Sequence, residues 1–446
     1  MTETPNYDNE YDAIVVGAGP AGSAAALTMA QQDLDVIIIE RGQYPGAKNV
    51  FGGVLFTPTI RELVDDLSEA PTERYVAEKK YSMLSEEDET ALSMKPGAWH
   101  EEPHNDSFTI LRGDFDEWFA EQAVDAGATL ITETTVLDVI REGDDEHGQI
   151  VGVETDRPDG ALRAPVVVLA EGANSLVSEG ADLKETADAE DVAVAAKEVR
   201  KYDRDTIEER FNLHDEDGVA YHYFGEGAIP EGFGGAYIYS NKRTISIGLA
   251  YSIAAAREHP KKPDEVLNDF KNHPAIAPLV RGGRLVEYSA HAIPEGGYEG
   301  VPDLVHNGAV LVGDTAGLVL NNGVHLEGTN MAAESGYHAG NAIVYAIERG
   351  RTDEAALSQY AEDLEDSFVM KNLEHYSWFQ DLVEQEEDFI FKELPSAIAE
   401  AEKEYFRMDK EPKESHAKKA KDIVLQAAGG YLGAAKRAWK FRRFLS

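Results

Sequence analysis

The sequence predicts an α/β fold in which a discontinuous parallel-sheet domain carries an inserted antiparallel sheet and is followed by a helical C-terminal region. Three observations lead to this prediction. Residues 11–40 have the pattern of a buried strand, a glycine-rich turn, a helix and a second strand. Residues 190–300 contain aromatic, alternating segments, and the buried-strand pattern returns at residues 309–314. From residue 353 onward the pattern is helical, rich in Ala, Glu, Leu and Lys.

The turn after the first strand has the composition of a dinucleotide-binding, Rossmann-like site. Gly17 and Gly19 let the backbone turn sharply and approach a ligand, and Gly22 lets the helix pack against the strand. The free N–H groups of the helix N-terminus favour a pyrophosphate at this turn. Glu40 ends the second strand at the spacing from Gly22 where a ribose diol is held. A chance glycine turn in a strand–helix–strand unit is the alternative, and the flanking strands and terminal acid make it the weaker one.

Composition limits the function classes that fit. The 446 residues are too many for one simple core and indicate two or three domains. Asp and Glu number 83 against 41 Lys and Arg, which gives a formal net charge of −42. The acids are spread along the chain, which indicates a hydrated surface suited to strong salt, so we expect a halophilic protein. An acidic mesophilic protein is the alternative, and in either case we expect no nucleic-acid partner.

Cysteine is absent from the sequence, which excludes disulfides, thiolate nucleophiles and cysteine-ligated iron–sulfur clusters within this chain. The first residues are acidic and lack the apolar segment of a secretory signal. No run of about eighteen apolar residues occurs, so we expect no transmembrane helix. We therefore expect a cytoplasmic protein.

Between the two glycine-rich sites, the sequence predicts a mixture of loops, helices and strands. Residues 41–53 are rich in glycine and lack periodicity, so we expect a loop running along the ligand. Thr57-Pro58 predicts the start of a short helix over residues 59–67. Further along, the sequence predicts three strands within residues 79–111, an amphipathic helix over 114–124, and strands at 129–141, 149–155 and 163–170.

Two further turns favour a flavin over a nicotinamide cofactor. A strand runs into Glu171-Gly172, and another runs into Gly313-Asp314, which is followed by a helix of small residues over 323–340. An aspartate at the second turn can accept hydrogen bonds from the ribityl hydroxyls of FAD. The helix N-terminus can stabilise negative charge on the pyrimidine edge of the flavin. The alternative is a capped helix after a core strand; with the first glycine site present, we predict FAD.

The predicted domains follow from this order of segments. FAD-binding parts are expected at residues 1–78, 111–185 and 301–350. Strands of a substrate domain are expected at 79–110 and 186–300, and the helical C-terminal region with a basic tail at 351–446.

At several motifs the chain resembles the FixC branch of the electron-transfer flavoprotein:quinone oxidoreductase family, within the geranylgeranyl reductase superfamily. The motifs are Tyr44–Gly53, Ala195–Val199, Gly234–Lys242, Ala290–Gly297 and His325–Asn330. The resemblance implies an FAD-dependent subunit that takes electrons from an electron-transfer flavoprotein and passes them to a membrane quinone. It further implies two flavoprotein subunits and a small ferredoxin-like iron–sulfur subunit as partners. The missing cysteines agree with a cluster on a separate chain.

The resemblance and the motifs give the candidate site. Lys48, Asn49 and Lys197 are the catalytic candidates, and Lys197-Glu198 is expected on a strand with one residue facing the flavin and the other facing away. A solvated loop lysine and a surface ion pair are the respective alternatives. No metal ligands are expected. The predicted cofactor contacts are Gly17, Gly19, Pro20, Ala21, Gly22, Glu40, Arg41, Gly52, Gly53, Arg112, Val136, Ala170, Glu171, Gly172, Gly313, Asp314, Gly328, Thr329 and Asn330.

Two histidines and the C-terminal tail have open interpretations. His291 and His325 lie beside glycine-rich turns and are either polar turn residues or proton donors to a quinone. The tail, residues 436–445, interleaves aromatic residues with five cations. It is either a solvated charged face or a contact with an acidic partner or a membrane, which would place the protein peripherally on the inner face of the cell membrane.

Two other functions remain open. A geranylgeranyl reductase of archaeal lipid synthesis would share the fold, although the segment Tyr237–Lys242 lacks the aromatic–Phe–Pro–Lys pattern of that group. The second open function is that of a non-catalytic scaffold subunit that holds a flavin.

Overall fold

The computed structural model describes residues 11–48, 52–143, 148–229, 233–323 and 326–445. A six-stranded sheet, in the order β17-β18-β11-β1-β2-β7, forms the first domain and is parallel except for the β17–β18 pair. Its central strands are fully buried runs of Ala, Val, Ile and Leu, as a sheet covered on both faces requires. The strands are β1 (Ala13–Val16), β2 (Val36–Ile39), β7 (Thr129–Ile131), β11 (Val166–Leu169), β17 (Val305–His306) and β18 (Ala309–Leu311).

Helix α1 (Pro20–Ala30) is buried along its whole length, because it lies between this sheet and the helices α9 (Thr329–Glu348) and α3 (Arg112–Asp125). Small residues make this packing close. A Cβ on Gly340 of α9 would lie 2.7 Å from Thr28 Cβ of α1, so the two helices approach to a distance that a larger residue would prevent. Helix α1 therefore positions the glycine turn and the start of α9 against each other.

The second domain is a nine-stranded sheet, in the order β16-β12-β15-β14-β13-β4-β6-β3 with β5 paired to β4. All neighbours are antiparallel except β13 and β4, which run parallel. The strands are β3 (Gly52–Phe56), β4 (Thr72–Leu84), β5 (Glu89–Met94), β6 (Ser107–Leu111), β12 (Val192–Lys201), β13 (Asp217–Phe224), β14 (Gly234–Ser240), β15 (Thr244–Ser252) and β16 (Arg284–Pro294).

One face of this sheet packs into an apolar core with short helices, and it includes Ala196, Ile238, Ile247 and Leu249. Because side chains alternate along a strand, Lys197, Tyr237, Tyr239 and Gly248 belong to the opposite face. The covering helices are α5 (Arg204–Phe211), α6 (Ile253–Glu258), α7 (Pro263–Asn272) and α8 (Ala277–Val280).

The remaining elements of the two domains are short. A three-stranded antiparallel sheet consists of β8 (Val136–Glu142), β9 (Gln149–Thr155) and β10 (Ala161–Arg163). The others are α2 (Pro58–Leu63), α4 (Leu176–Gly180), β19 (Leu320–Asn321), β20 (Leu326–Glu327) and the short helical turns η1 (Leu67–Glu69), η2 (Gly97–His100), η3 (His104–Asp106) and η4 (Gly313–Ala316).

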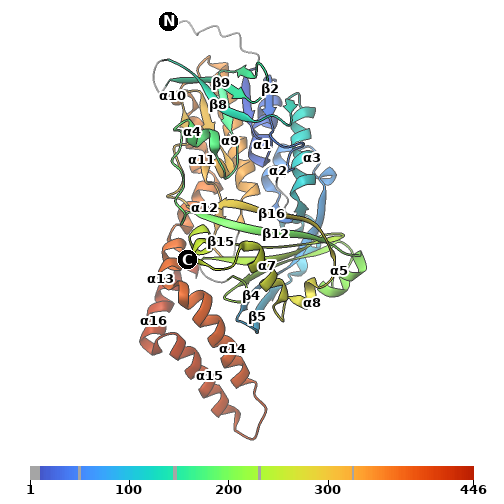
Figure 1. Cartoon of the computed structure of the whole chain (residues 1–446), viewed down its shortest axis with the longest axis vertical. Coiled ribbons are helices and arrows are strands. Elements are labelled where there is room, and N and C mark those ends of the chain that lie inside the picture. Colours follow the sequence, from blue (N-terminus) through green and yellow to red (C-terminus); the bar gives the residue numbers. More distant parts are fainter. Residues whose placement is uncertain (1–10, 49–51, 144–147, 230–232, 324–325, 446) are drawn as a thin grey trace.

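The C-terminal region is helical, and its last helices project from the two domains as an arm (Figure 1). Lys403 of α14 pairs with Asp88, and Glu402 accepts a hydrogen bond from Thr90, so the arm is fixed to the β4–β5 hairpin. The elements are α10 (Glu354–Leu357), α11 (Gln359–Asp366), α12 (Phe368–Tyr376), α13 (Trp378–Asp388), η5 (Phe389–Glu393), α14 (Leu394–Tyr405), α15 (Lys413–Ala427), α16 (Gly430–Phe441) and η6 (Arg442–Leu445).

The predicted fold class is confirmed, and the local differences have physical reasons. Strand β3 begins at Gly52, so the expected loop over residues 41–53 is too long; β3 pairs with β6, a partner distant in sequence. The helix predicted over residues 59–67 ends at Leu63, because Val64 is extended. Strand β3 and the start of β4 both belong to the nine-stranded sheet. They fall within residues 1–78, for which an FAD-binding part is predicted. Among the described residues, no helix has the length and apolarity that crossing a membrane requires.

The acidic surface leads to a prediction about salt. Within the described residues, the acidic residues in the buried class are Asp116, Glu198, Asp217 and Glu295, and the carboxyl of Asp314 is also desolvated, so most of the acids still face water. Their repulsion is screened over about 10 Å at 0.1 M salt and about 3 Å at 1 M. We therefore expect the melting temperature to rise by at least about 10 °C between those two KCl concentrations. Calorimetry would measure it, and a melting temperature that does not change with salt would refute a halophilic protein.

Candidate functional site

One cavity of about 470 Å³ is lined by residues of both sheets. From the first domain it takes the glycine turn, the ends of β2 and β11, the turn η4 and the start of α9. From the second it takes side chains of β3, β4, β12, β13, β14 and β16. The carboxyl ends of parallel strands therefore face an antiparallel sheet across the cavity, an arrangement suited to an elongated ligand.

The glycine turn has the close packing that a pyrophosphate site requires. Gly17 has φ +102°, and a Cβ there would overlap the carbonyl oxygen of Ala170. A Cβ on Gly22 would overlap the carbonyl oxygen of Gly17. Gly19 has open space where its Cβ would stand, and it lines the cavity. The three glycines thus have separate tasks: a turn, helix packing and room for a ligand.

Glu40 is fixed at the end of β2. Its carboxylate accepts hydrogen bonds from the backbone N–H groups of Ala18 and Gly42. This holds the carboxylate beside the glycine turn, where the sequence predicts the ribose contact. Arg41 and Val136 also line the cavity.

Glu171 has a structural task as well as a place in the lining. Its carboxylate accepts hydrogen bonds from the N–H groups of Val177 and Ser178 and from the Ser178 hydroxyl. It therefore satisfies the N-terminus of α4. Ala170 and Gly172, on either side, also line the cavity.

The second predicted turn meets the start of α9. Asp314 lies in η4 and lines the cavity together with Gly328, the N-cap of α9, and Thr329. Burial raises the pKa of the Asp314 carboxyl. Gly313 has φ +60°, and a Cβ there would lie 2.8 Å from Ala21 Cβ, so η4 lies directly against α1. The side chain of Asn330 donates to Glu327 at 2.7 Å.

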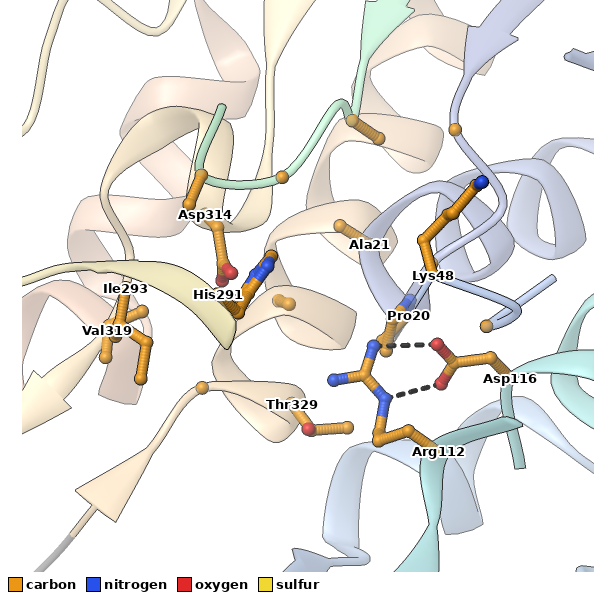
Figure 2. A pocket seen from close by; sticks show the side chains of 18 of the residues that line it. Pro20, Ala21, Lys48, Arg112, Asp116, His291, Ile293, Asp314, Val319 and Thr329 are labelled. Atoms are coloured by element: carbon orange, nitrogen blue, oxygen red, sulfur yellow. Dashed lines mark hydrogen bonds and ion pairs between the residues drawn. The ribbon is translucent and has the colours of Figure 1, made fainter. Parts of the chain in front are cut away.

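An ion pair from α3 reaches the cavity. Arg112 donates two hydrogen bonds to Asp116, at 2.6 and 2.7 Å (Figure 2). Both residues line the cavity, and the Asp116 side chain is buried. A bidentate pair of this kind fixes the plane of the guanidinium group. In Figure 2 the side chains of Arg112, Asp314 and His291, which come from three separate segments, all reach into the cavity.

Lys197 and Glu198 take opposite faces of β12. Lys197 lines the cavity and is 7% exposed, while Glu198 pairs with Lys271 of α7 and with Arg200. Burial lowers the pKa of Lys197 to about 7, with Arg112 acting in the same direction and Asp314 against it. The lysine therefore exchanges its proton near neutral pH.

His291 lies on β16 beside these charges and lines the cavity. Burial, followed by the positive charges of Lys197, Arg112 and Arg41, lowers its pKa to about 4. The imidazole is thus neutral at neutral pH and can accept a hydrogen bond there. His325 lies outside the described residues.

The wall of the cavity that is formed by β3, β4, β13 and β14, called the far wall below, contains residues that the sequence reasoning did not single out. Tyr81 of β4 stacks on His222 of β13, with ring centroids 5.3 Å apart, and Tyr239 of β14 meets His222 edge-on at 5.7 Å. Lys79 lies 5.1 Å from the Phe56 ring centroid. The alternation within these strands was visible in the sequence. Which face of these strands meets the cavity depends on how segments distant in the sequence pair in the sheet. That pairing cannot be read from the sequence.

The predicted site residues fall into three groups. Five of the described residues are not in the cavity lining: Gly22, Gly52, Gly53, Gly313 and Asn330. Of these, Gly52 begins β3 and pairs with Leu111. Asn49 lies outside the described residues. The others line the cavity together: Gly17, Gly19, Pro20, Ala21, Glu40, Arg41, Lys48, Arg112, Val136, Ala170, Glu171, Gly172, Lys197, Asp314, Gly328 and Thr329.

Comparison with known proteins decides the family. A family model for FAD dependent oxidoreductases matches residues 12–220, and a model for the ETF-QO/FixC family C-terminal domain matches residues 379–445. Protein FixC of Bradyrhizobium diazoefficiens is 40% identical over 97% of this chain and 100% of its own length. The chain belongs to the ETF-QO/FixC family. The Escherichia coli protein described as a probable electron transfer flavoprotein-quinone oxidoreductase, YdiS, is 38% identical over 92% of this chain and 96% of its own.

Solved structures show the same fold at lower identity. A geranylgeranyl bacteriochlorophyll reductase-like protein from Thermoplasma acidophilum matches with a TM-score of 0.68 and 21% identity, over 96% of this chain and 98% of that one. The present chain, as a member of the ETF-QO/FixC family, is an FAD-dependent oxidoreductase. The cavity fits FAD: Gly19 has open space beside the turn where a pyrophosphate is predicted, backbone hydrogen bonds hold Glu40 where a ribose contact is predicted, and Asp314 lines the cavity together with the start of α9.

Proposed function

We propose that this protein takes electrons from an electron-transfer flavoprotein and passes them to a membrane quinone. The observation that carries the proposal is the full-length similarity to FixC proteins and to YdiS. Bound FAD supplies the redox chemistry, since it can accept and release electrons. The chain itself binds the cofactor, orients it and controls the charge and water around it.

The residues of the cavity have separate tasks in this proposal. The glycine turn and Glu40 hold the adenosine diphosphate half of FAD, and Asp314 accepts from the ribityl chain. Lys197, on the sheet side, places a positive charge toward the ring system, where reduction adds negative charge. Lys48, also in the lining, is the second candidate for that task.

The far wall supports a flat, partly apolar substrate. Phe56, Tyr81 and Tyr239 present aromatic surface, and His222 adds a group that can exchange a proton. A quinone ring stacks well on such a surface and takes up protons when it is reduced. The geranylgeranyl reductase alternative has only fold similarity in its favour, at 21% identity.

An iron–sulfur partner is part of the proposal. The chain has no cysteine, so a cluster of the usual kind must come from another subunit. We propose a small ferredoxin-like subunit as its carrier. Reduction of a quinone analogue should then be slow with the flavoprotein partner alone and fast when the iron–sulfur subunit is added.

A steady-state assay tests this function. The FAD-loaded protein, its flavoprotein partner and the iron–sulfur subunit would be combined without oxygen, and reduction of a soluble quinone analogue followed. Turnover with the quinone and none with a geranylgeranyl lipid supports the proposal. The reverse result would assign the protein to the reductases, and no turnover with either would favour a scaffold subunit.

The C-terminal arm is the proposed contact with an anionic membrane. Its helix α16 exposes Tyr431 (70%), Leu432 (88%) and Trp439 (63%). Part of the basic tail is used internally, since Arg437 and Lys440 both pair with Glu386 of α13. The exposed cations of the tail include Lys436 and Arg442, and the guanidinium of Arg442 lies 4.3 Å from the Trp439 ring centroid.

Charge reversal tests this contact without removing the pairs to Glu386. The double variant Lys436→Glu, Arg442→Glu should keep its FAD and bind anionic vesicles about tenfold more weakly at low salt, since each cation near such a surface contributes about 1 kcal/mol. The matched control is Arg281→Glu, Arg284→Glu, two exposed arginines, the first at the C-cap of α8 and the second at the start of β16. Equal vesicle sedimentation of the two variants would show that the tail is only a solvated helix.

A further inference from the structure

Lys79 of β4 places a positive charge in the aromatic far wall of the cavity. Its side chain lines the cavity, and so does that of Tyr81, two residues further along the same face of the strand. Residues two apart on a strand are separated by about 6.6 Å. Across the sheet Lys79 pairs with Ala220, and Tyr81 pairs with His222. Lys79 is therefore a direct neighbour of the stacked rings of Tyr81 and His222.

Two aromatic rings hold the ammonium group of Lys79. Its Nζ lies 5.1 Å from the ring centroid of Phe56 on β3 and 5.8 Å from that of Trp99 in η2. The faces of such rings attract a cation, which favours this position of the lysine. They use none of its three N–H donors in an ordinary hydrogen bond. The rings therefore place the charge and leave its donors for another group.

The turn that carries Trp99 is fixed to the sheet. The carbonyl oxygen of Trp99 accepts a hydrogen bond from Nδ1 of His104 at 3.1 Å. The His104 ring stacks on Tyr75 of β4, with centroids 4.1 Å apart and planes at 12°. The Tyr75 hydroxyl in turn donates to the buried carboxylate of Asp217 on β13. The ring beside Lys79 is thus anchored to β4 and β13, two strands of the far wall.

The next lysine of the strand differs in its partners. Lys80 faces the opposite side of the sheet, pairs with Glu89 at 2.8 Å and lies 4.5 Å from the ring centroid of Tyr221. For Lys79, no ion pair or hydrogen bond of the ammonium group is found within the described part of the chain. Burial lowers the pKa of Lys79, and the charge of Glu327, also in the cavity lining, opposes this. A half-buried cation of this kind suits a ligand that supplies an electron-rich oxygen.

We propose that Lys79 recognises the quinone: its ammonium group donates a hydrogen bond to one carbonyl oxygen of a quinone ring that lies against the far wall. This oxygen gains negative charge as the ring is reduced, so a fixed cation stabilises the reduced ring more than the oxidised one. The inference rests on the proposed function of the cavity and adds a residue that contacts the substrate. Lys197, in contrast, is assigned to the flavin.

The test compares two electron acceptors. The FAD-loaded protein, its flavoprotein partner and the iron–sulfur subunit would reduce either menadione or a short-tailed benzoquinone, and separately ferricenium, which has no carbonyl oxygen. Lys79→Met should lower kcat/KM for the quinone by roughly 10- to 100-fold, because a hydrogen bond from a charged group is lost. The rate with ferricenium, the FAD content and the midpoint potential of the FAD should stay at their native values. Lys79→Arg keeps the charge and should lose clearly less than Lys79→Met.

The matched control is Lys80→Met, on the same strand and the opposite face, which should keep kcat/KM within about threefold of the native value. Equal values for Lys79→Met and Lys80→Met overturn the inference and leave the proposed function intact. A loss in Lys79→Met that extends to ferricenium, or that shifts the midpoint potential, also overturns it, since the charge then acts on the flavin. If the native protein reduces ferricenium but neither quinone, the proposed function is wrong and so is this inference.

Discussion

Replacing Lys197 with methionine is expected to lower the rate of quinone reduction by roughly 10²–10³-fold, while FAD stays bound. Methionine keeps most of the length and apolar volume of the lysine and removes its charge. The side chain lines the cavity, is buried, and faces a space shared with Arg112 and Asp314. A positive charge fixed there stabilises the negative charge that the flavin gains on reduction. Water that must first reorient would stabilise this charge less well.

The same reasoning gives the pH dependence. A lysine is charged below its pKa, and burial places that of Lys197 at about 7. If the ammonium form is the active one, the rate should fall as the pH rises through 7. The Lys197→Met variant should lack this fall.

Lys271→Met is the matched control for this variant. Lys271 of α7 pairs at 2.6 Å with Glu198, the residue next to Lys197 that faces the opposite side of the sheet. It is not among the residues that line the cavity, so its loss should leave the rate within about threefold of the native value. A Lys197→Met variant as fast as Lys271→Met would contradict the proposed role.

Replacing Arg112 with alanine is expected to destabilise the fold by about 3–5 kcal/mol, because it leaves the buried carboxylate of Asp116 without its partner. The guanidinium also lines the cavity, so the variant should retain less FAD. Urea unfolding and the flavin content of the purified protein would measure the two effects separately.

A double variant separates packing from cofactor binding. With Arg112→Leu and Asp116→Leu together, no unpaired charge remains, and stability should return to near the native value. FAD retention should stay low if Arg112 contacts the cofactor. Full recovery of both would show that the pair is only structural, and an unchanged stability of Arg112→Ala would contradict the burial argument itself.

Features that depend on local sequence were predictable. The glycine turn, Glu40 and the Gly313-Asp314 turn carry their signals within a few residues, and all three meet at one cavity. The alternation of Lys197 and Glu198 across β12 likewise follows from strand geometry. The fold class followed because these patterns recur in separate segments of the chain.

Features that depend on pairing between distant segments were not predictable. The Arg112–Asp116 pair is local, four residues apart on α3, but its place in the cavity lining depends on how α3 packs against the rest of the fold. The aromatic wall needs β4, β13 and β14 to be neighbours, and the parallel β4–β13 pair joins residues that are far apart in the sequence. The tail that contains Arg437 and Lys440 was predicted to be either a solvated charged face or a contact with a partner or membrane, whereas the fold places both of these cations against Glu386.

The central claim is that electrons pass from an electron-transfer flavoprotein through this protein to a quinone, and an anaerobic single-turnover experiment tests it most directly. Reduced electron-transfer flavoprotein would be mixed with the oxidised, FAD-loaded protein, and a quinone analogue added afterwards with the iron–sulfur subunit. The visible absorbance of the protein's own FAD is predicted to be lost on the first addition and to return on the second. An absorbance that stays unchanged when the reduced flavoprotein is added, or that is lost only with NADH, would contradict the account.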